Sequence, residues 1–194
     1  KEDARNILGI PENRKYVLFG AIGGTQDPRK GFDYLKNAIN LIPDDYELLV
    51  FGDGNKKIIK ESGKTYHYLG FINSDKELSI LYSSADVMVV PSMQENLSNA
   101  IMEAQSCATP VVAFDIGGNS DLVLHKQTGY LAKHFSSKDL ANGIIWTVTN
   151  NRYLSHQSRK NVLNKFCNKV VTPSYISLYK KILSSKSQTD LNQE

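Results

Sequence analysis

The stretch VMVVPSMQENLSNAIMEA, residues 87–104, joins an apolar run to a helix-like segment through a polar turn. The run from Val87 to Val90 is apolar at every position, which is typical of a strand buried on both faces of a sheet. Residues 97–107 are mostly apolar over a length that favours a helix. A buried strand that leads into a helix is the repeating unit of parallel α/β proteins. This stretch therefore predicts an α/β fold.

The same alternation continues on both sides of this stretch. Further short apolar runs predict strands at 16–19, 46–51, 66–69, 110–114 and 129–132. Helix-like segments lie between and after them at 32–42, 56–62, 76–83, 140–149, 153–166 and 175–183. Strands alternating with helices of about ten residues predict right-handed crossovers and a parallel sheet covered on both faces. We expect a doubly wound, Rossmann-like sheet, in which ligands bind outside the carboxyl ends of the strands.

The length of 194 residues fits one domain, because a single core usually serves roughly 100–200 residues. We assign residues 1–183 to this domain and the polar residues 184–194 to a flexible tail. The charged start, Lys1 to Arg5, reads as a helix already under way that closes at Gly9. We therefore expect the chain to have been cut from a longer protein.

The composition argues against several classes of protein. The net charge of +3 is small and spread along the chain, which argues against binding to nucleic acid. The four histidines are scattered and the two cysteines lie far apart, so no metal site is predicted. Two distant cysteines favour a reducing, cytoplasmic compartment. No stretch approaches the roughly 18 apolar residues of a membrane-spanning helix.

A loop rich in small residues follows the first predicted strand. It runs from Gly20 to Thr25, includes Gly23, and is followed by Arg29 and Lys30 at the head of a helix. Small residues let a ligand approach the backbone, and cations beside a helix N-terminus suit a phosphate. The alternative is a glycine-rich turn with two solvated cations, and this stretch alone leaves both open.

Two glutamates flank the predicted start of the helix after Val90. Ser98 or Asn96 could cap that helix, and Glu103 falls about 7 Å along its axis. If the free N–H groups near Ser98 bind an anion, Glu103 lies from that anion at about the length of a ribose, and Glu95 lies on the other side of the anion. Carboxylates bind diols by accepting two hydrogen bonds, so a nucleotide bearing a sugar fits both glutamates. Taken singly, each glutamate could equally be a solvated helix residue.

Several motifs of this sequence together resemble those of one protein family. Glu95 and Glu103 are separated by seven residues after a Val-Val-Pro-Ser strand end, which resembles the signature of the group 1 retaining glycosyltransferases of the GT-B fold. Segments similar to the family stand in the family's order at 27–32, 68–72, 81–86, 107–113, 117–121 and 128–131. The resemblance covers about residues 1–183, corresponds to the C-terminal, donor-binding half of the fold and is nearest to bacterial exopolysaccharide transferases. It implies a preceding N-terminal acceptor domain.

The resemblance also implies roles for particular residues. In this family the lysine of a Lys-Gly pair contacts the donor diphosphate, which corresponds to Lys30. The first glutamate contacts the transferred sugar and the second binds the ribose, which corresponds to Glu95 and Glu103. In this family, backbone N–H groups after the first glutamate bind the sugar and the phosphate, and the corresponding residues are Asn96, Leu97, Ser98 and Asn99. The backbone after the third strand contacts the base, which corresponds to Phe71 and Ile72.

The chain departs from the family pattern in two places. The family's arginine after the first strand is replaced by Ala21-Ile22-Gly23, and Arg29 is the candidate to take its role. The family's glycines after the first glutamate are replaced by Asn96 and Ser98, whose side chains narrow the space near the sugar and are expected to bias donor choice.

The implied function is transfer of a sugar, with retained configuration, from a UDP- or GDP-sugar to a saccharide or lipid-linked acceptor in polysaccharide synthesis. Lys30 and Glu95 are the predicted catalytic residues, because charge grows on the leaving diphosphate and the sugar must be oriented. No metal or other cofactor is expected, because the cations and a helix N-terminus face the phosphates. The C-terminal half alone should bind the donor but transfer little or no sugar. We expect the protein in the cytoplasm or peripherally at the inner face of the membrane.

Two other functions stay open on sequence grounds. A GT-B sugar-nucleotide epimerase or hydrolase would break the donor without using an acceptor. A non-catalytic, receiver-like or regulatory nucleotide-binding module would use Asp53, after the second strand, as its phosphorylation site. Such a module needs an acidic pair near the first strand, where this chain has Gly20-Ala21.

Overall fold

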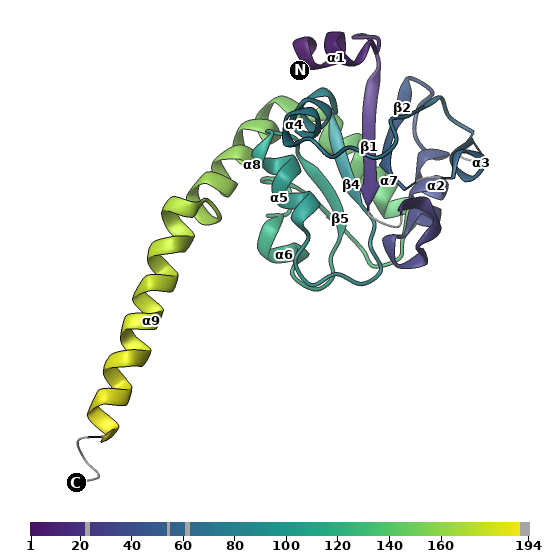
Figure 1. The fold of residues 1–194 in the computed structure, drawn as a ribbon. Coiled ribbons are helices and arrows are strands. Elements are labelled where there is room, and N and C mark those ends of the chain that lie inside the picture. The colour runs from purple at the N-terminus through teal and green to yellow at the C-terminus, as the bar shows by residue number, and fades with distance from the viewer. Residues whose placement is uncertain (22–23, 54, 61–62, 191–194) are drawn as a thin grey trace.

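The computed structural model describes residues 1–21, 24–53, 55–60 and 63–190 (Figure 1). Its centre is a six-stranded sheet in the order β3-β2-β1-β4-β5-β6, with every pair of neighbours parallel. The strands are β1 Lys15–Ala21, β2 Tyr46–Gly52, β3 Tyr66–Tyr68, β4 Val87–Val90, β5 Val111–Phe114 and β6 Gly129–Ala132. The predicted doubly wound α/β fold is confirmed. The strand order reverses between β1 and β4, and a ligand crevice is expected at that switch point.

The helices cover both faces of the sheet. They are α1 Glu2–Leu8, α2 Phe32–Ile39, α3 Lys56–Lys60, α4 Asp75–Ser84, α5 Asn99–Ser106, α6 Asn119–Leu122, α7 Ser137–Thr149, α8 Asn151–Lys165 and α9 Asn168–Asp190. Successive residues of β1 point to opposite faces. Val17 and Phe19 pack in the core with α2 and α7, whereas Tyr16 and Leu18 pack in the core with α4 and α5. Two apolar cores therefore hold the sheet between its helices.

The structure differs from the expected elements in several places, including the following. The four-residue helix α6 was not predicted. The helix after β4 begins at Asn99 instead of residue 97. Helix α9 begins at Asn168 and contains Pro173, although a proline in a helix interior removes one hydrogen bond and usually marks a boundary. The segment expected as a tail from residue 184 is helical as far as Asp190, and its flexibility stays a prediction.

Helix α9 extends away from the rest of the domain (Figure 1). Its side chains from 172 to 184 are exposed, and they include Tyr175, Tyr179 and Leu183. Among the described residues, none of the helices has the length and apolar content required to cross a membrane.

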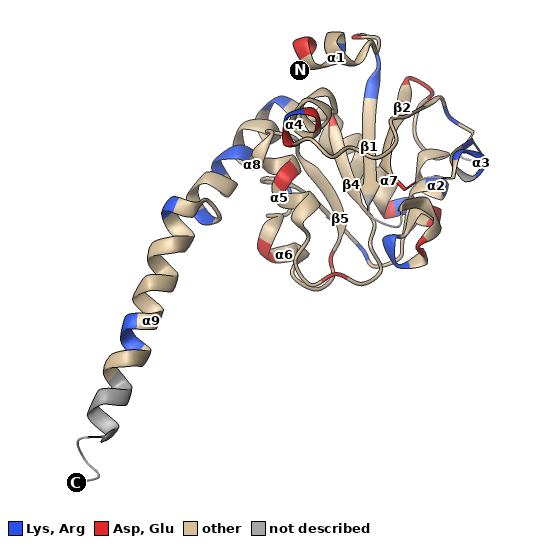
Figure 2. Cartoon of the chain, viewed as in Figure 1, with Lys and Arg blue, Asp and Glu red and all other residues tan. Residues whose placement is uncertain are grey.

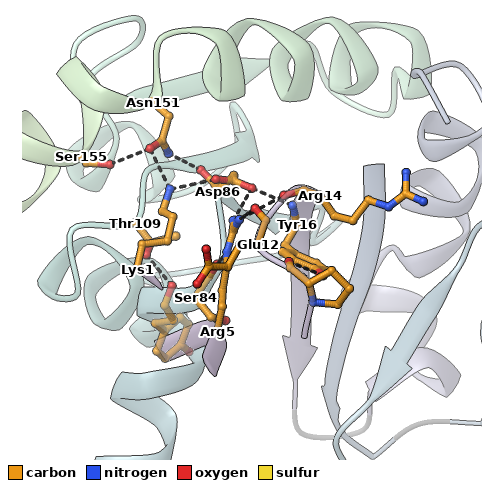
Figure 3. A network of polar contacts seen from close by, with 12 residues as sticks. Lys1, Arg5, Glu12, Arg14, Tyr16, Ser84, Asp86, Thr109, Asn151 and Ser155 are labelled. Atoms are coloured by element: carbon orange, nitrogen blue, oxygen red, sulfur yellow. Dashed lines mark hydrogen bonds and ion pairs between the residues drawn. The ribbon is translucent and has the colours of Figure 1, made fainter. Parts of the chain in front are cut away.

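Helix α1 is fixed to the amino ends of the strands by a polar network around Asp86 (Figure 3). The Arg5 side chain is buried, with its guanidinium 2.8 Å from one Asp86 oxygen. Lys1 lies 2.8 Å from the other oxygen, and the Tyr16 N–H donates to Asp86 at 2.7 Å. Asp86 immediately precedes β4, so this network lies at the edge of the sheet opposite the carboxyl ends of the strands.

Candidate functional site

A cavity of about 440 Å³ lies at the carboxyl ends of β1, β2 and β4. This is the edge at which the strand order reverses. Most of the predicted site residues line it together, namely Lys30, Phe71, Ile72, Glu95, Leu97, Ser98, Asn99 and Glu103. The crossover topology brings these residues together from three separate stretches of the chain, around residues 30, 71–72 and 95–103.

A second, more open hollow of about 460 Å³ adjoins this cavity. Its lining includes the predicted residues Arg29 and Asn96, and it shares Lys30 and Glu95 with the cavity. The Lys30 Nζ atom lies 3.7 Å from a Glu95 carboxylate oxygen, so this ion pair stands at the boundary of the two spaces. The remaining predicted residue, Gly23, lies outside the described residues.

The position of Lys30 is set by the tight turn that follows it. A 3₁₀ helix, Pro28–Lys30, ends at Gly31, whose φ of +68° is in the left-handed region that favours glycine. A Cβ atom on Gly31 would lie only 1.9 Å from the carbonyl oxygen of Pro91. The Met93 N–H also donates to the Arg29 carbonyl at 2.7 Å. The Lys-Gly turn is therefore pressed directly against the loop that follows β4.

Arg29 is less available to a ligand than Lys30. Its guanidinium donates to both carboxylate oxygens of Asp27, at 3.1 and 2.8 Å, and its side chain is 71% exposed. The hydrogen bonds from Arg29 hold the pKa of the Asp27 carboxyl below its ordinary value. Within the described lining of the cavity, Lys30 is the only lysine or arginine. Lys30 is therefore the cation best placed to meet an anion there.

Helix α5 begins at the cavity. Ser98 occupies its N-cap position and is buried, but its side chain makes no capping hydrogen bond in the described structure. The first N–H groups of a helix have no partner within the helix and carry a partial positive charge. Asn99 and Ala100, in the first turn of α5, line the cavity. This end of the cavity therefore offers backbone donors beside the Lys30 ammonium group.

Two glycines after β5 support the loop that carries Glu95. The Gly118 N–H donates to the Asn96 carbonyl at 2.8 Å. A Cβ atom on Gly117 would lie 1.8 Å from the Glu95 carbonyl oxygen, and one on Gly118 would lie 2.2 Å from that of Asn96. No role at the site was predicted for these glycines, although two adjacent glycines after a buried strand indicate a close approach of the backbone.

Glu103 has a hydrogen-bond partner, Tyr82, that was not among the predicted site residues. The Tyr82 hydroxyl donates to Glu103 Oε2 at 2.9 Å, and both residues line the cavity. Burial raises the pKa of Tyr82 far above its ordinary value, so the hydroxyl stays protonated. Glu103 is itself exposed, and as the acidic residue in the sequence of α5 it accounts for the red segment on that helix in Figure 2. The carboxylate is therefore both solvated and held by one neutral donor.

The rest of the lining is largely apolar. Phe71 is 60% exposed and lines the cavity with Ile72 and Phe51. A Cβ atom on Gly20 would lie 2.1 Å from the Phe51 ring, so glycine lets this ring lie across the end of β1. The cavity thus combines a polar part, formed by a lysine, two carboxylates and backbone donors, with apolar and aromatic walls.

Residues 1–21, 24–53, 55–60 and 63–190 contain no group of three or more His, Cys, Asp or Glu side chains that could hold a metal ion. The expectation that donor binding requires no metal stays a prediction.

The fold and the cavity define a Rossmann-like domain with a ligand crevice at its switch point. A family model described as "Glycosyl transferases group 1" matches residues 16–150. The chain therefore belongs to the group 1 glycosyltransferases. The resemblance seen in the sequence is confirmed at this level.

Individual proteins show the same similarity. An uncharacterised glycosyltransferase of Methanocaldococcus jannaschii is 27% identical over 93% of this chain and 48% of its own length. A UDP-Gal:alpha-D-GlcNAc-diphosphoundecaprenol alpha-1,3-galactosyltransferase of Escherichia coli is 30% identical over 84% of this chain and 43% of its own length. The solved sucrose-phosphate synthase of Thermosynechococcus elongatus superposes with a TM-score of 0.83 at 28% identity, covering 95% of this chain and 49% of that one. The chain thus spans about half the length, or less, of these relatives.

Proposed function

We propose that this chain is the donor-binding half of a retaining glycosyltransferase and that its cavity binds a nucleoside diphosphate sugar. The observation that carries the proposal is the meeting of Lys30, the N-terminus of α5 and Glu103 in one cavity at the switch point of the sheet. A cation and backbone donors suit a diphosphate, and a carboxylate suits a diol. A nucleoside diphosphate contains both groups.

Lys30 and the first turn of α5 would hold the diphosphate. During transfer the bond between the sugar and the diphosphate breaks, so negative charge grows on the departing phosphate oxygen. Donors already directed at that oxygen stabilise the transition state more than the ground state. Lys30 has this role in the proposal, whereas the exposed Arg29 is already paired with Asp27.

Glu95 would orient the transferred sugar. Its carboxylate lies 3.7 Å from Lys30 at the boundary between the cavity and the outer hollow. Binding of the donor diphosphate would give Lys30 a second anionic partner and leave Glu95 oxygens for sugar hydroxyls. Asn96, exposed beside Glu95 in the outer hollow, would then limit which sugar fits.

Glu103 would bind the ribose, and the base would lie by the backbone of Phe71 and Ile72. The name of the Escherichia coli relative includes a UDP-sugar donor and a lipid-linked acceptor. By analogy we propose a UDP- or GDP-sugar donor and a saccharide or lipid-linked acceptor in bacterial polysaccharide synthesis. Acceptor binding would fall to an N-terminal domain, at the cytoplasmic face of the membrane.

Calorimetric titration with UDP and with GDP tests the donor-binding proposal. We expect the wild-type chain to bind at least one of them, and Glu103→Gln to bind it about 10- to 100-fold more weakly, because a hydrogen bond to a charged group contributes about 1.5–3 kcal/mol. Glu2→Gln, which removes an exposed carboxylate from α1, is the matched control and should bind like the wild type. Failure of the folded wild type to bind either nucleotide would contradict the proposal, as would unchanged binding by Glu103→Gln.

A further inference from the structure

Tyr82 connects the core of the domain to the carboxylate of Glu103. The Tyr82 residue is 2% exposed, yet its hydroxyl reaches the cavity and donates to Glu103 Oε2 at 2.9 Å. Glu103 is exposed on α5, whereas Tyr82 lies on α4, so the contact joins two helices. The hydroxyl is thus a buried donor directed at an exposed site carboxylate.

The position of the Tyr82 hydroxyl is fixed from two sides. The Phe51 and Tyr82 rings meet edge to face, with their centroids 5.9 Å apart at 83°. The Thr109 hydroxyl donates to the Tyr82 carbonyl at 2.6 Å, which holds the backbone at the end of α4. A ring held in this way presents its hydroxyl at one place. Glu103, by contrast, has a long and flexible side chain, and within the described structure the Tyr82 hydroxyl is its side-chain hydrogen-bond partner.

The remaining lone pairs of Glu103 suit a diol. An ionised carboxylate offers about four acceptor positions, and Tyr82 occupies one of them on Oε2. Oε1 and the second lone pair of Oε2 stay available for two neighbouring hydroxyl donors. Ordering a flexible side chain during binding costs about 0.5–1.5 kcal/mol. The Tyr82 hydrogen bond orders the carboxylate before the ligand arrives, which removes much of this cost.

We infer that Tyr82 is a positioning residue that fixes the Glu103 carboxylate for the two ribose hydroxyls and so determines selectivity for ribonucleotides over deoxyribonucleotides. This inference rests on the proposed function, because it takes the diol to be the ribose of the donor. It assigns Tyr82 no contact with the nucleotide itself. Its effect should therefore depend on the presence of Glu103.

The test compares UDP with 2′-deoxy-UDP, or GDP with 2′-deoxy-GDP if the chain binds GDP. Calorimetry on the wild type, Tyr82→Phe, Glu103→Gln and the double variant gives a dissociation constant for each ligand. We expect the wild type to prefer the ribonucleotide. Tyr82→Phe should weaken ribonucleotide binding about 2- to 10-fold, which corresponds to the cost of ordering one flexible side chain during binding, and should change deoxyribonucleotide binding less. In the Glu103→Gln background the same substitution should have little further effect.

A matched control separates positioning from a structural role. Tyr16 is also fully buried, and its hydroxyl donates to the Pro11 carbonyl at 2.9 Å, at the opposite edge of the sheet. Tyr16→Phe should lose a similar amount of stability in thermal unfolding but keep the wild-type ratio of the two dissociation constants. Phenylalanine preserves the ring of Tyr82 and its contact with Phe51.

The outcomes that overturn the inference differ from those that overturn the proposed function. If Glu103→Gln loses the preference for ribose but Tyr82→Phe retains it, the positioning role is wrong and the donor site stands. If Tyr82→Phe has the same effect with and without Glu103, Tyr82 does not act through that carboxylate and the inference is again wrong. If the wild type binds no nucleotide, the proposed function fails and the inference fails with it.

Discussion

Replacing Arg5 by alanine is expected to lower the free energy of unfolding by about 3–5 kcal/mol, the usual effect of removing one partner from a buried ion pair. The Arg5 residue is 5% exposed and pairs with Asp86 at 2.8 Å. Its guanidinium also donates to the carbonyls of Ser84, Glu12 and Arg14 at 2.8–3.1 Å (Figure 3). The substitution would leave these three carbonyls without this donor, and it would leave the Asp86 carboxylate with Lys1 and the Tyr16 N–H as its described partners.

Urea unfolding at neutral pH measures the effect of Arg5→Ala. Arg152→Ala, which removes an exposed arginine from α8, is the matched control and should change the free energy of unfolding by less than about 0.5 kcal/mol. Where Arg5→Ala remains folded, its nucleotide affinity should equal that of the wild type, because the Asp86 network lies at the edge of the sheet opposite the cavity. A loss of stability below about 1 kcal/mol would show that α1 contributes little to the fold.

Replacing Lys30 by alanine is expected to weaken UDP or GDP binding about 10- to 100-fold, because the diphosphate would lose a charge-assisted hydrogen bond of about 1.5–3 kcal/mol. Lys30 is the only lysine or arginine in the described lining of the cavity. The free nucleoside has no phosphate, so its binding should change little. Stability should fall by less than about 1 kcal/mol, because the pair with Glu95 is long, at 3.7 Å, and the Lys30 side chain is 30% exposed.

Calorimetric titration of Lys30→Ala with the nucleoside diphosphate and with the nucleoside measures both affinities and tests this prediction. Lys160→Ala, which removes an exposed lysine from α8, has the same change of charge and should bind both ligands like the wild type. Equal losses of affinity for the diphosphate and for the nucleoside would show that Lys30 does not act through the phosphate groups. Unchanged diphosphate binding would do the same.

The sheet could be predicted because its strands are short, nearly continuous apolar runs. Val87 to Val90 and Val111 to Phe114 are buried at every position, so their continuous apolar sequences indicate strands covered on both faces. Helix α6 has four residues, Asn119–Leu122, which is too short for a periodic apolar pattern. The predicted start of the last helix, residue 175, was wrong: α9 begins at Asn168 and contains Pro173, a residue that is unfavourable in a helix interior.

The site could be predicted only in part from the sequence. The residues that line it follow the carboxyl ends of strands, which sequence patterns locate. Contacts between distant residues, such as Tyr82 with Glu103 or Gly117 with Glu95, depend on how helices and loops pack around the sheet. The pairing of Arg29 with Asp27 involves residues only two apart, but the prediction that Arg29 binds a phosphate left out the nearby Asp27 carboxylate.

The most direct test of the donor site is NMR titration of the ¹⁵N-labelled chain with the nucleoside diphosphate that it binds. We predict saturable shifts in the amide signals of Gly31, Ile72 and residues 98–100, which line or border the cavity. The signals of residues 175–183 in α9 should not move. Absence of any shift, or shifts that cluster away from the cavity, would contradict the central claim that this cavity binds the nucleotide-sugar donor.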